Sequence, residues 1–453
     1  MSRCKVFVAL VVVACFGCRV EERMVWSPDG SRAAVVLPHG LCLMDAAGKV
    51  VGPISTDVVG VSWLANGRGL VVAKTVAVTR WAELGKFLPV EEVALVESLG
   101  KGLLHFLCGA AAVTEGDVGA IEQKVLRPLQ MRPAEPLLSA VVLYVRDTRF
   151  AEMQRFLQAG MLPSEWGQAL RESKEVRLYE LSVLELEGKK PLGEPIVIER
   201  SLELLTEPRV SPDGKWVGYL RAGRLMVAPT DGGASRLQVA EKVVGSFDWT
   251  RDSKALVYAV CVGERWEENA LNLVRIERRE ASEGAGAPVL LASAAVGFQP
   301  RVRCLPDGRV LFASLQGQLP MPGNATNVAC FYVVDGAGGI AQVQVSKGTL
   351  PSELGSFAVS PDGQRVAVVE SGSDAVVVLD MRSGAAEVVS PRRTGRSRTL
   401  PAWRNADELY FAALPRDGAL RAEWLRWRVG AGAEVVSGDW PGDWVKNLVE
   451  TGR

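Results

Sequence analysis

One short stretch, Arg209–Leu220, contains the unit that the rest of the chain repeats, and it limits the possible folds more than any other feature. Its centre reads S-P-D-G at 211–214, where proline presets φ, aspartate tolerates the next position and glycine takes the left-handed position that follows. An apolar piece ending at Val210 precedes the turn, and the β-branched and aromatic run Trp216–Leu220 follows it. Two such runs around a tight turn predict a β-hairpin, which cannot bury its apolar face alone. The unit therefore implies a fold that is built from many copies.

The hairpin unit occurs seven times, four times with P-D-G intact and three times in a degenerate form. The residue before each turn is, in order, Trp26, Trp63, Val210, Trp249, Cys304, Val359 and Trp403. Third strands that end in Asp follow at 41–45, 331–335 and 376–380, and a fourth run closes each unit. The pre-turn positions are 37, 147, 39, 55, 55 and 44 residues apart. Periods near forty with four strands each predict an all-β fold, a seven-bladed β-propeller of four-stranded blades.

Repeats that read S-P-D-G, then an apolar strand, then a strand ending in V-x-D with a nearby Gly resemble the WD-like repeats of TolB-type β-propellers. The same motif builds the propeller of prolyl oligopeptidase-like enzymes. The resemblance covers nearly all of residues 20–440 apart from one insertion, and it implies a fold rather than a function. We therefore interpret the turn aspartates as structural, not as catalytic acids or calcium ligands, and the pre-turn tryptophans as packing between blades. The turn aspartates in question are Asp29, Asp213, Asp307 and Asp362.

The gap of 147 residues is the exception to the period. A normal blade takes about 40 residues, so roughly a hundred are extra. Blade two starts at Trp63 and resumes near Val176, and residues 79–174 between them predict an α-helical insertion. We expect three helices: one over 90–112, one that begins after an N-cap at Asp147 and one that begins after an N-cap at Ser164. Residues 141–145 are ambiguous between strand and helix. In a four-stranded meander, the insertion, the loops 261–270 and 314–327 and the link 390–400 share one face, where propellers usually bind their partners.

The first eighteen residues have the pattern of an export signal. Arg3 and Lys5 precede eleven apolar residues at 6–16, a run too short to span a bilayer. The run ends at Gly17-Cys18, which resembles a bacterial lipobox, where cleavage leaves the cysteine N-terminal and lipidated; residues 15 and 16 depart from the usual pattern. We expect an exported chain in the periplasm or on the outer surface, joined to the membrane only by a lipid anchor at Cys18. Cleavage by the ordinary signal peptidase is the alternative.

Neither the net charge nor the reactive residues indicate a catalytic, metal-binding or nucleic-acid-binding function. The 52 basic residues balance the 52 acidic ones, so the chain has no general attraction for nucleic acid. The five cysteines beyond the signal region are widely spaced and odd in number, which favours buried hydrophobic residues over a disulfide framework. The two histidines, His39 and His105, have no zinc-site spacing, and no G-x-S-x-G or Walker A motif is present. We expect no catalytic residue, metal or cofactor.

The most suggestive polar cluster is a group of four arginines within the link 390–400. As a functional patch it could hold a phosphate, an acidic glycan or an acidic protein surface. The alternative is a solvated loop without a binding role, which the repulsion between its positive charges keeps open. The four residues are Arg392, Arg393, Arg396 and Arg398.

The sequence predicts five segments: a signal peptide at 1–17, blade one and the start of blade two at 18–78, the helical insertion at 79–174, the rest of the propeller at 175–440 and a tail at 441–453. The predicted function is that of a non-catalytic cell-envelope propeller that binds a protein or glycan partner. The alternative is a propeller hydrolase or lyase that uses the mouth of the central channel. Carboxylates or histidines converging there would favour the enzyme.

Overall fold

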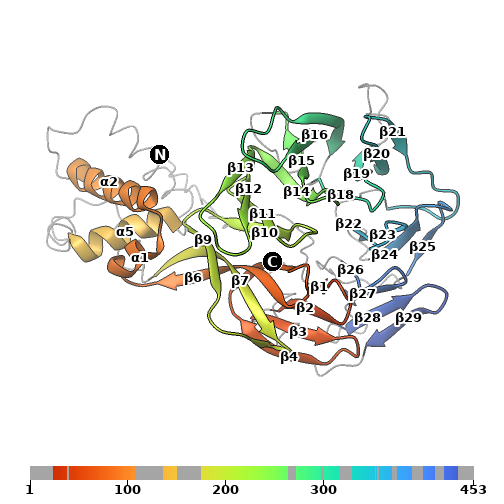
Figure 1. The fold of residues 1–453 in the computed structure, drawn as a ribbon, viewed down its shortest axis with the longest axis horizontal. Coiled ribbons are helices and arrows are strands. Elements are labelled where there is room, and N and C mark those ends of the chain that lie inside the picture. Colours follow the sequence, from red (N-terminus) through yellow and green to blue (C-terminus); the bar gives the residue numbers. More distant parts are fainter. Residues whose placement is uncertain are drawn as a thin grey trace, which may run out of the picture. The chain divides into compact units, whose positions relative to one another are not determined.

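A computed structural model describes residues 24–37, 40–107, 136–149, 175–263, 272–296, 300–315, 329–351, 354, 357–369, 375–389, 401–413 and 423–436. These residues form seven antiparallel sheets, six of four strands and one of five (Figure 1). The predicted seven-bladed β-propeller is confirmed. The chain divides into two compact units, residues 25–260 with 277–289, and residues 261–276 with the described residues from Leu290 onward.

Each blade is a meander in which consecutive strands pair, except that the last two strands of blade two both pair with its third strand. Blade one contains β1 (Met24–Trp26), β2 (Arg32–Leu37), β3 (Gly40–Asp45) and β4 (Val50–Ser55). Blade two contains β5 (Val58–Trp63), β6 (Gly69–Val78), β7 (Val176–Glu187), the two-residue β8 (Lys190–Pro191) and β9 (Ile196–Ser201). Blade three contains β10 (Leu205–Val210), β11 (Trp216–Arg221), β12 (Arg224–Pro229) and β13 (Leu237–Ala240).

The remaining blades follow the same order. Blade four contains β14 (Val243–Trp249), β15 (Ala255–Cys261), β16 (Asn272–Glu280) and β17 (Val289–Val296). Blade five contains β18 (Val302–Cys304), β19 (Val310–Leu315), β20 (Ala329–Val334) and β21 (Ile340–Gln342). Blade six contains β22 (Phe357–Val359), β23 (Arg365–Val369), β24 (Val376–Asp380) and β25 (Ala386–Val388). Blade seven contains β26 (Ala402–Trp403), β27 (Glu408–Ala413), β28 (Glu423–Arg428) and β29 (Gly432–Val436). All seven inner strands end at the residue that the sequence placed before the turn.

The S-P-D-G turn is held by its own side chains. Gly214 has φ 76° and donates its N–H to the carbonyl of Ser211 at 2.8 Å. The Ser211 hydroxyl donates to the Asp213 carboxylate at 2.6 Å, and that carboxylate also accepts the N–H of Lys215 at 3.1 Å. Equivalent serine–aspartate contacts recur at 27–29 and 360–362, and a threonine–aspartate contact at 250–252. These aspartates are thus partners of the turn, as predicted.

Three of the pre-turn tryptophans join their blade to the one before it. In each case the indole N–H donates to a backbone carbonyl in the inner strand of the preceding blade. The acceptor is the residue immediately before the pre-turn residue of that strand. The pairs are Trp63 with Val25 at 2.8 Å, Trp249 with Arg209 at 2.9 Å, and Trp403 with Ala358 at 3.0 Å. Buried apolar clusters fill the space between consecutive blades within each unit. The prediction that these tryptophans pack between blades is confirmed.

The insertion between β6 and β7 is helical where the structure describes it, with α1 (Trp81–Phe87), α2 (Val90–Leu107) and α5 (Pro136–Thr148). The ambiguous segment 141–145 lies inside α5 and is therefore helix. The predicted N-cap at Asp147 is wrong: the apolar run continues as helix up to it, and Asp147 lies in the last turn of α5. Its carboxylate instead accepts the N–H of Trp81 at 2.7 Å, which caps α1 from a distant part of the chain.

Several predicted features lie outside the described residues: the signal segment, the helices expected after 149, most of the loops 261–270 and 314–327, the link 390–400 and the tail. Among the described helices, none is both long and apolar enough to cross a membrane.

Candidate functional site

The insertion is carried by an extension of two strands of blade two. β6 and β7 pair without a break from Gly69 with Glu185 to Val78 with Val176. The neighbouring strands end earlier, since β5 pairs with β6 only as far as Lys74, and β9 pairs with β7 only from Tyr179. Beyond these points the described strands form a two-stranded ribbon, residues 76–78 and 176–178, which we call the neck. The neck leads away from the blade and into α1 (Figure 1).

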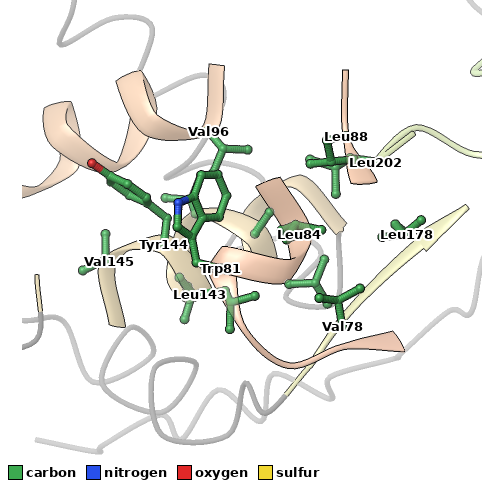
Figure 2. Close-up of a cluster of buried hydrophobic side chains, with 14 of the residues drawn as sticks. Val78, Trp81, Leu84, Leu88, Val96, Leu143, Tyr144, Val145, Leu178 and Leu202 are labelled. Carbon is green, nitrogen blue, oxygen red and sulfur yellow. The ribbon is translucent and has the colours of Figure 1, made fainter. Parts of the chain in front are cut away.

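The three helices enclose a hydrophobic core of their own (Figure 2). Six consecutive residues of α5, Ala140–Val145, are at most 4% exposed, so this helix is covered on every side and forms the centre of the insertion. Trp81 and Leu84 of α1 and Val96 and Leu99 of α2 pack around it. The same core includes Val78, Val176 and Leu178 of the neck, and Leu202 of the link that follows β9.

Close contact between α2 and α5 depends on Gly100. A methyl group on Gly100 would lie 2.4 Å from Cδ1 of Tyr144, closer than two carbon atoms can approach. The Tyr144 ring is 4% exposed and packs edge-on against Trp81, with ring centroids 5.0 Å apart. The helices are thus fitted to each other at the level of single side chains.

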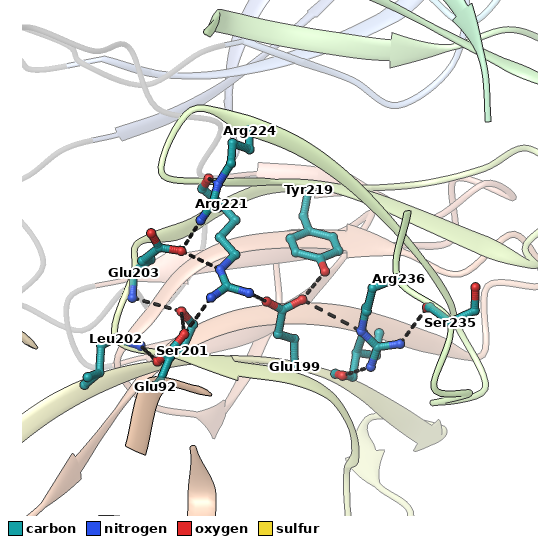
Figure 3. A network of polar contacts seen from close by, with 11 residues as sticks. Glu92, Glu199, Ser201, Leu202, Glu203, Tyr219, Arg221, Arg224, Ser235 and Arg236 are labelled. Carbon is teal, nitrogen blue, oxygen red and sulfur yellow. Dashed lines mark hydrogen bonds and ion pairs between the residues drawn. The ribbon is translucent and has the colours of Figure 1, made fainter. Parts of the chain in front are cut away.

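A charged network joins α2 to blades two and three (Figure 3). The Arg221 guanidinium, at the end of β11, contacts three carboxylates. It lies 2.6 Å from Glu92 of α2, 2.9 Å from Glu199 of β9 and 2.6 Å from Glu203. Arg224 also pairs with Glu203. The insertion is therefore fixed to the rim by a guanidinium that the propeller itself holds in place.

Glu92 occupies a site with three donors. Its Oε1 accepts the Arg221 guanidinium and, at 2.8 Å, the hydroxyl of Ser201. Its Oε2 accepts the backbone N–H of Leu202 at 2.9 Å. A carboxylate that accepts a guanidinium and two further donors is held more strongly and in a more defined geometry than a simple surface ion pair.

Burial and charge affect the titration of the groups around this site. Burial works against the charge of Arg221, but the attraction of Glu199, Glu203 and Glu92 outweighs it and raises the pKa of the guanidinium. Tyr219 of β11 donates its hydroxyl to Glu199. Burial, followed by the negative charge of Glu199, raises the pKa of this phenol above its ordinary value. Arg221 and Tyr219 therefore keep their protons at all physiological pH values and act as fixed donors.

A second contact joins α1 to blade two. The guanidinium carbon of Arg200, on β9, lies 4.5 Å from the ring centroid of Phe87 at the end of α1, a cation–π contact. The same guanidinium donates to Glu180 of β7 at 2.8 Å, and Glu180 also pairs with Lys74 of β6 at 3.2 Å. Strands that belong to the blade thus orient the arginine that contacts the insertion.

The outer surface of the described helices is exposed and polar. The outer residues of α1 and of the start of α2 are exposed, among them Lys86, Glu91 and Val90, whose side chain is 79% exposed. An open hollow of about 460 Å³ lies where the neck meets α1 and α5, lined in part by Arg80 and Arg146. Within the described ranges, no group of three or more His, Cys, Asp or Glu side chains could hold a metal ion.

The structure does not describe the candidates chosen from the sequence. Cys18, the four arginines of the link 390–400 and His39 are outside the described residues, and so is the side chain of His105. Glu92, Glu199, Glu203 and Arg221 were not identified from the sequence. The repeat topology does place the turn after β11 and the link after β9 on the same face as the insertion. No sequence signal, however, indicates that α2 reaches them.

A comparison with protein families matches residues 332–442 to the lipoprotein LpqB beta-propeller domain. These residues run from β20 through blades six and seven and carry the turn and strand pattern that all seven blades share. This chain is a seven-bladed β-propeller. The matched family is described as a domain of a lipoprotein. No curated protein matches the chain.

Solved structures that this propeller resembles include TolB from Acinetobacter baumannii, with 18% identity over 57% of this chain and 61% of that one, at a TM-score of 0.39. Hydrazine synthase from Kuenenia stuttgartiensis has 13% identity, with 91% and 94% covered and a TM-score of 0.45. The Cps50 (Swd1) β-propeller domain of Myceliophteria thermophila has 9% identity, with 91% and 96% covered and a TM-score of 0.47. The propeller thus spans less than two thirds of that TolB chain, and we rest no functional argument on these similarities.

Proposed function

We propose that this chain is a non-catalytic propeller of the cell envelope, anchored by a lipid at Cys18, that recognises a protein or glycan partner through its helical insertion. The observation that supports this most directly is the folded state of the insertion. Its described helices have a core of their own, a neck and two sets of contacts to the rim, and the blades need none of these for their own folding. Blade three connects its second and third strands, β11 and β12, with only the residues 222–223.

The chemistry of the exposed helices suits a polar partner surface. The outer faces of α1 and α2 carry both acidic and basic side chains, with the apolar Val90 among them. Such mixed surfaces are typical of protein contacts with a polar rim and a small apolar centre. In this proposal the arginine cluster of the link 390–400 provides a second contact, for acidic groups of the same partner. Apart from Glu92, which faces the rim, the charged residues of the two helices are Glu83, Lys86, Glu91, Glu97 and Lys101.

The decisive experiment removes the insertion and keeps the blade. Thr75 and Tyr179 are cross-strand partners, so replacing residues 76–178 by Asn-Gly closes β6 and β7 as a regular hairpin. Leu202→Ser is added because Leu202 loses its apolar cover. We expect this variant to remain folded and β-rich by circular dichroism, and to lose the partner that the intact protein captures from a cell-envelope extract.

A matched control makes the single substitution Ala222→Asn, which gives the two-residue turn 222–223 of blade three the same Asn-Gly sequence, leaves the insertion in place and should leave capture unchanged. If the shortened protein folds and still captures the same partner, the recognition surface lies outside the insertion and the proposal is wrong.

A further inference from the structure

The contact between Glu92 and the rim has the form of a ligand in a binding site (Figure 3). All three donors to its carboxylate belong to the propeller. They are the Arg221 guanidinium at 2.6 Å, the Ser201 hydroxyl at 2.8 Å and the backbone N–H of Leu202 at 2.9 Å. An ionised carboxylate only accepts hydrogen bonds, so one charged and two neutral donors that reach both of its oxygens suit this group.

The propeller holds the charged donor in place without the insertion. The Arg221 guanidinium lies 2.9 Å from Glu199 and 2.6 Å from Glu203, both in or after β9. Glu199 is buried and accepts the hydroxyl of Tyr219, and Glu203 also pairs with Arg224. The position of the guanidinium is therefore set by blades two and three.

The neutral donors are fixed by the same two blades. Ser201 is fully buried and pairs with Tyr179 of β7 across the sheet. Its hydroxyl oxygen accepts the N–H of Glu203 at 2.9 Å, which leaves the hydroxyl proton free to be donated to a ligand. The link that carries the next backbone N–H is tied to blade three, because Ala222 donates its N–H to the carbonyl of Leu204 at 3.0 Å. Both neutral donors are thus in place before a carboxylate arrives.

The balance of charge favours an anion at this position. Without the carboxylate of Glu92, three guanidiniums at the rim face only two carboxylates. The side chains of Glu92 and Arg221 are 12% and 22% exposed, and such partial burial strengthens charge-assisted hydrogen bonds. The side chain of Glu203 is 40% exposed, so the site reaches solvent on one side and a small ion can enter it. The guanidiniums are those of Arg221, Arg224 and Arg236, and the carboxylates are those of Glu199 and Glu203.

We propose that the rim of blades two and three contains a preformed carboxylate-binding site, in which Glu92 of the insertion is the resident ligand. A small free carboxylate occupies the site when the carboxylate of Glu92 is removed. The insertion stays in place without this contact, because Leu202 remains packed in its core and Arg200 remains against Phe87. The site is a property of the propeller and does not depend on the partner proposed above.

The test replaces the resident carboxylate by acetate in the full-length chain. Glu92→Ala keeps Cβ and removes a part of the side chain that has the size and charge of acetate. Titration with isotope-labelled acetate at constant ionic strength, followed by NMR, measures binding. We expect saturable binding to Glu92→Ala that is at least about tenfold tighter than to the parent, whose site is filled. Acetamide has the same shape without the charge and should not bind.

Matched variants show where the acetate binds. Glu92→Gln fills the site with a neutral group, and Glu91→Ala, at an exposed position one residue earlier, leaves the site filled by Glu92. Neither should bind acetate more tightly than the parent. Adding Ser201→Ala to Glu92→Ala removes one donor and should weaken acetate binding about fivefold. Arg221 is left intact because its removal would leave Glu199 buried without its guanidinium.

Hydrogen exchange of the α5 amides at 140–145 reports whether the insertion stays folded. If these amides exchange as slowly in Glu92→Ala as in the parent and no acetate binds, the donors do not form a site by themselves and the proposal is wrong. If they exchange faster, the proposal requires that acetate, and not acetamide, restores the slow exchange, and a failure to do so overturns it. Equal binding of acetate by Glu92→Ala and Glu91→Ala also contradicts it, because the acetate would then bind elsewhere.

Discussion

Hydrogen bonds of single side chains stabilise the repeated turns, and the same contacts recur where the residue types of the turn differ. In the degenerate turn of blade four, Thr250 takes the place of serine and donates to Asp252 at 2.6 Å. Ser253 takes the place of glycine and adopts φ 61°, a left-handed conformation that non-glycine residues rarely adopt. In the four turns that begin with Ser or Thr, the shared contact is therefore a hydroxyl that donates to the carboxylate two residues later, and the glycine only lowers the strain.

The turn contacts should make stability depend on pH in the acid range. The hydroxyl of Ser27, followed by the N–H and hydroxyl of Ser31, lowers the pKa of Asp29 from 3.8 to about 2. A carboxyl whose pKa is lower in the folded state stabilises the fold above its unfolded pKa, and this stabilisation disappears as the pH falls from about 4 towards 2. We expect Asp29→Asn to lower the free energy of unfolding at pH 7 by about 1 kcal/mol, less than the full pKa difference would give, because Asp29 is exposed.

Chemical denaturation of the parent and of Asp29→Asn at several pH values measures this effect. The difference between the two proteins should shrink as the pH falls below 4 and vanish near 2. The control is Glu194→Gln, which removes an exposed carboxylate in the link before β9 and should give no such pH-dependent difference. A constant difference between Asp29→Asn and the parent at every pH would contradict the role given to the carboxylate charge.

At this scale the sequence predicts contacts between residues that are close along the chain, and it does not predict contacts between residues that are far apart along the chain. The partners in the S-P-D-G turn are two to five residues apart, so residue preferences alone indicate them. Glu92 and Arg221 are 129 residues apart, and Trp81 and Asp147 are 66 residues apart. Only the path of the folded chain brings such pairs together. For this reason Asp147 was assigned as a cap of the helix after it, whereas it caps α1.

At the scale of elements, the insertion depends on how closely α2 approaches α5. Two glycines of its helices offer a direct comparison: Gly100 faces the Tyr144 ring, whereas a methyl group on Gly85 of α1 would meet no atom within 4 Å. Glycine in a helix costs about 1 kcal/mol relative to alanine through its backbone freedom. The same substitution should therefore have opposite effects at the two positions.

We expect Gly100→Ala to destabilise the insertion by about 1–3 kcal/mol, because the overpacking against Tyr144 exceeds the gain in helix propensity. Gly85→Ala should be neutral or stabilise it by up to about 1 kcal/mol. Hydrogen exchange of the α5 amides measures both, since these amides lie in the core of the insertion. Equal protection of α5 in the two variants would show that the helices are not closely packed at Gly100.

Helix and strand could be distinguished from the sequence wherever one face is buried, but not where all faces are. Residues 141–145 read V-V-L-Y-V, which gives no periodicity, and α5 is buried on every side. Its helical state follows from its place at the centre of the insertion, which the sequence does not reveal. The inner strands, in contrast, were located to the residue because each is followed by a turn motif with a fixed phase.

At the scale of the whole molecule, the sequence predicted the repeat and its count because every copy carries the same turn. The family match at 332–442 and the seven sheets agree with that prediction. The contacts of the insertion could not be predicted in the same way, since the insertion occurs once and has no second copy with which to compare it. They are seen only in the structure, around Arg221, Arg200 and the neck.

The predicted lipid anchor lies shortly before the first strand. Cys18 follows the apolar run 6–16 and Gly17, and the five residues 19–23 separate it from Met24, where β1 begins. At roughly 3.4 Å for each of the steps from Cys18 to Met24 this tether reaches about 20 Å, so a lipid on Cys18 would keep β1 close to the membrane surface.

We expect the mature protein to begin at Cys18, to carry a lipid there and to partition into the detergent phase. Cys18→Ser should abolish the lipid and move the protein to the aqueous phase, because the serine hydroxyl cannot form the thioether that links a lipid to cysteine. Intact-mass and N-terminal analysis of the protein from the membrane fraction measure both. Cys42→Ser is the matched control and should stay lipidated, since Cys42 is buried within β3. An unmodified N-terminus at another residue would show that the ordinary signal peptidase cleaves the chain. A Cys18→Ser protein that remains lipidated would show that the lipid is attached elsewhere.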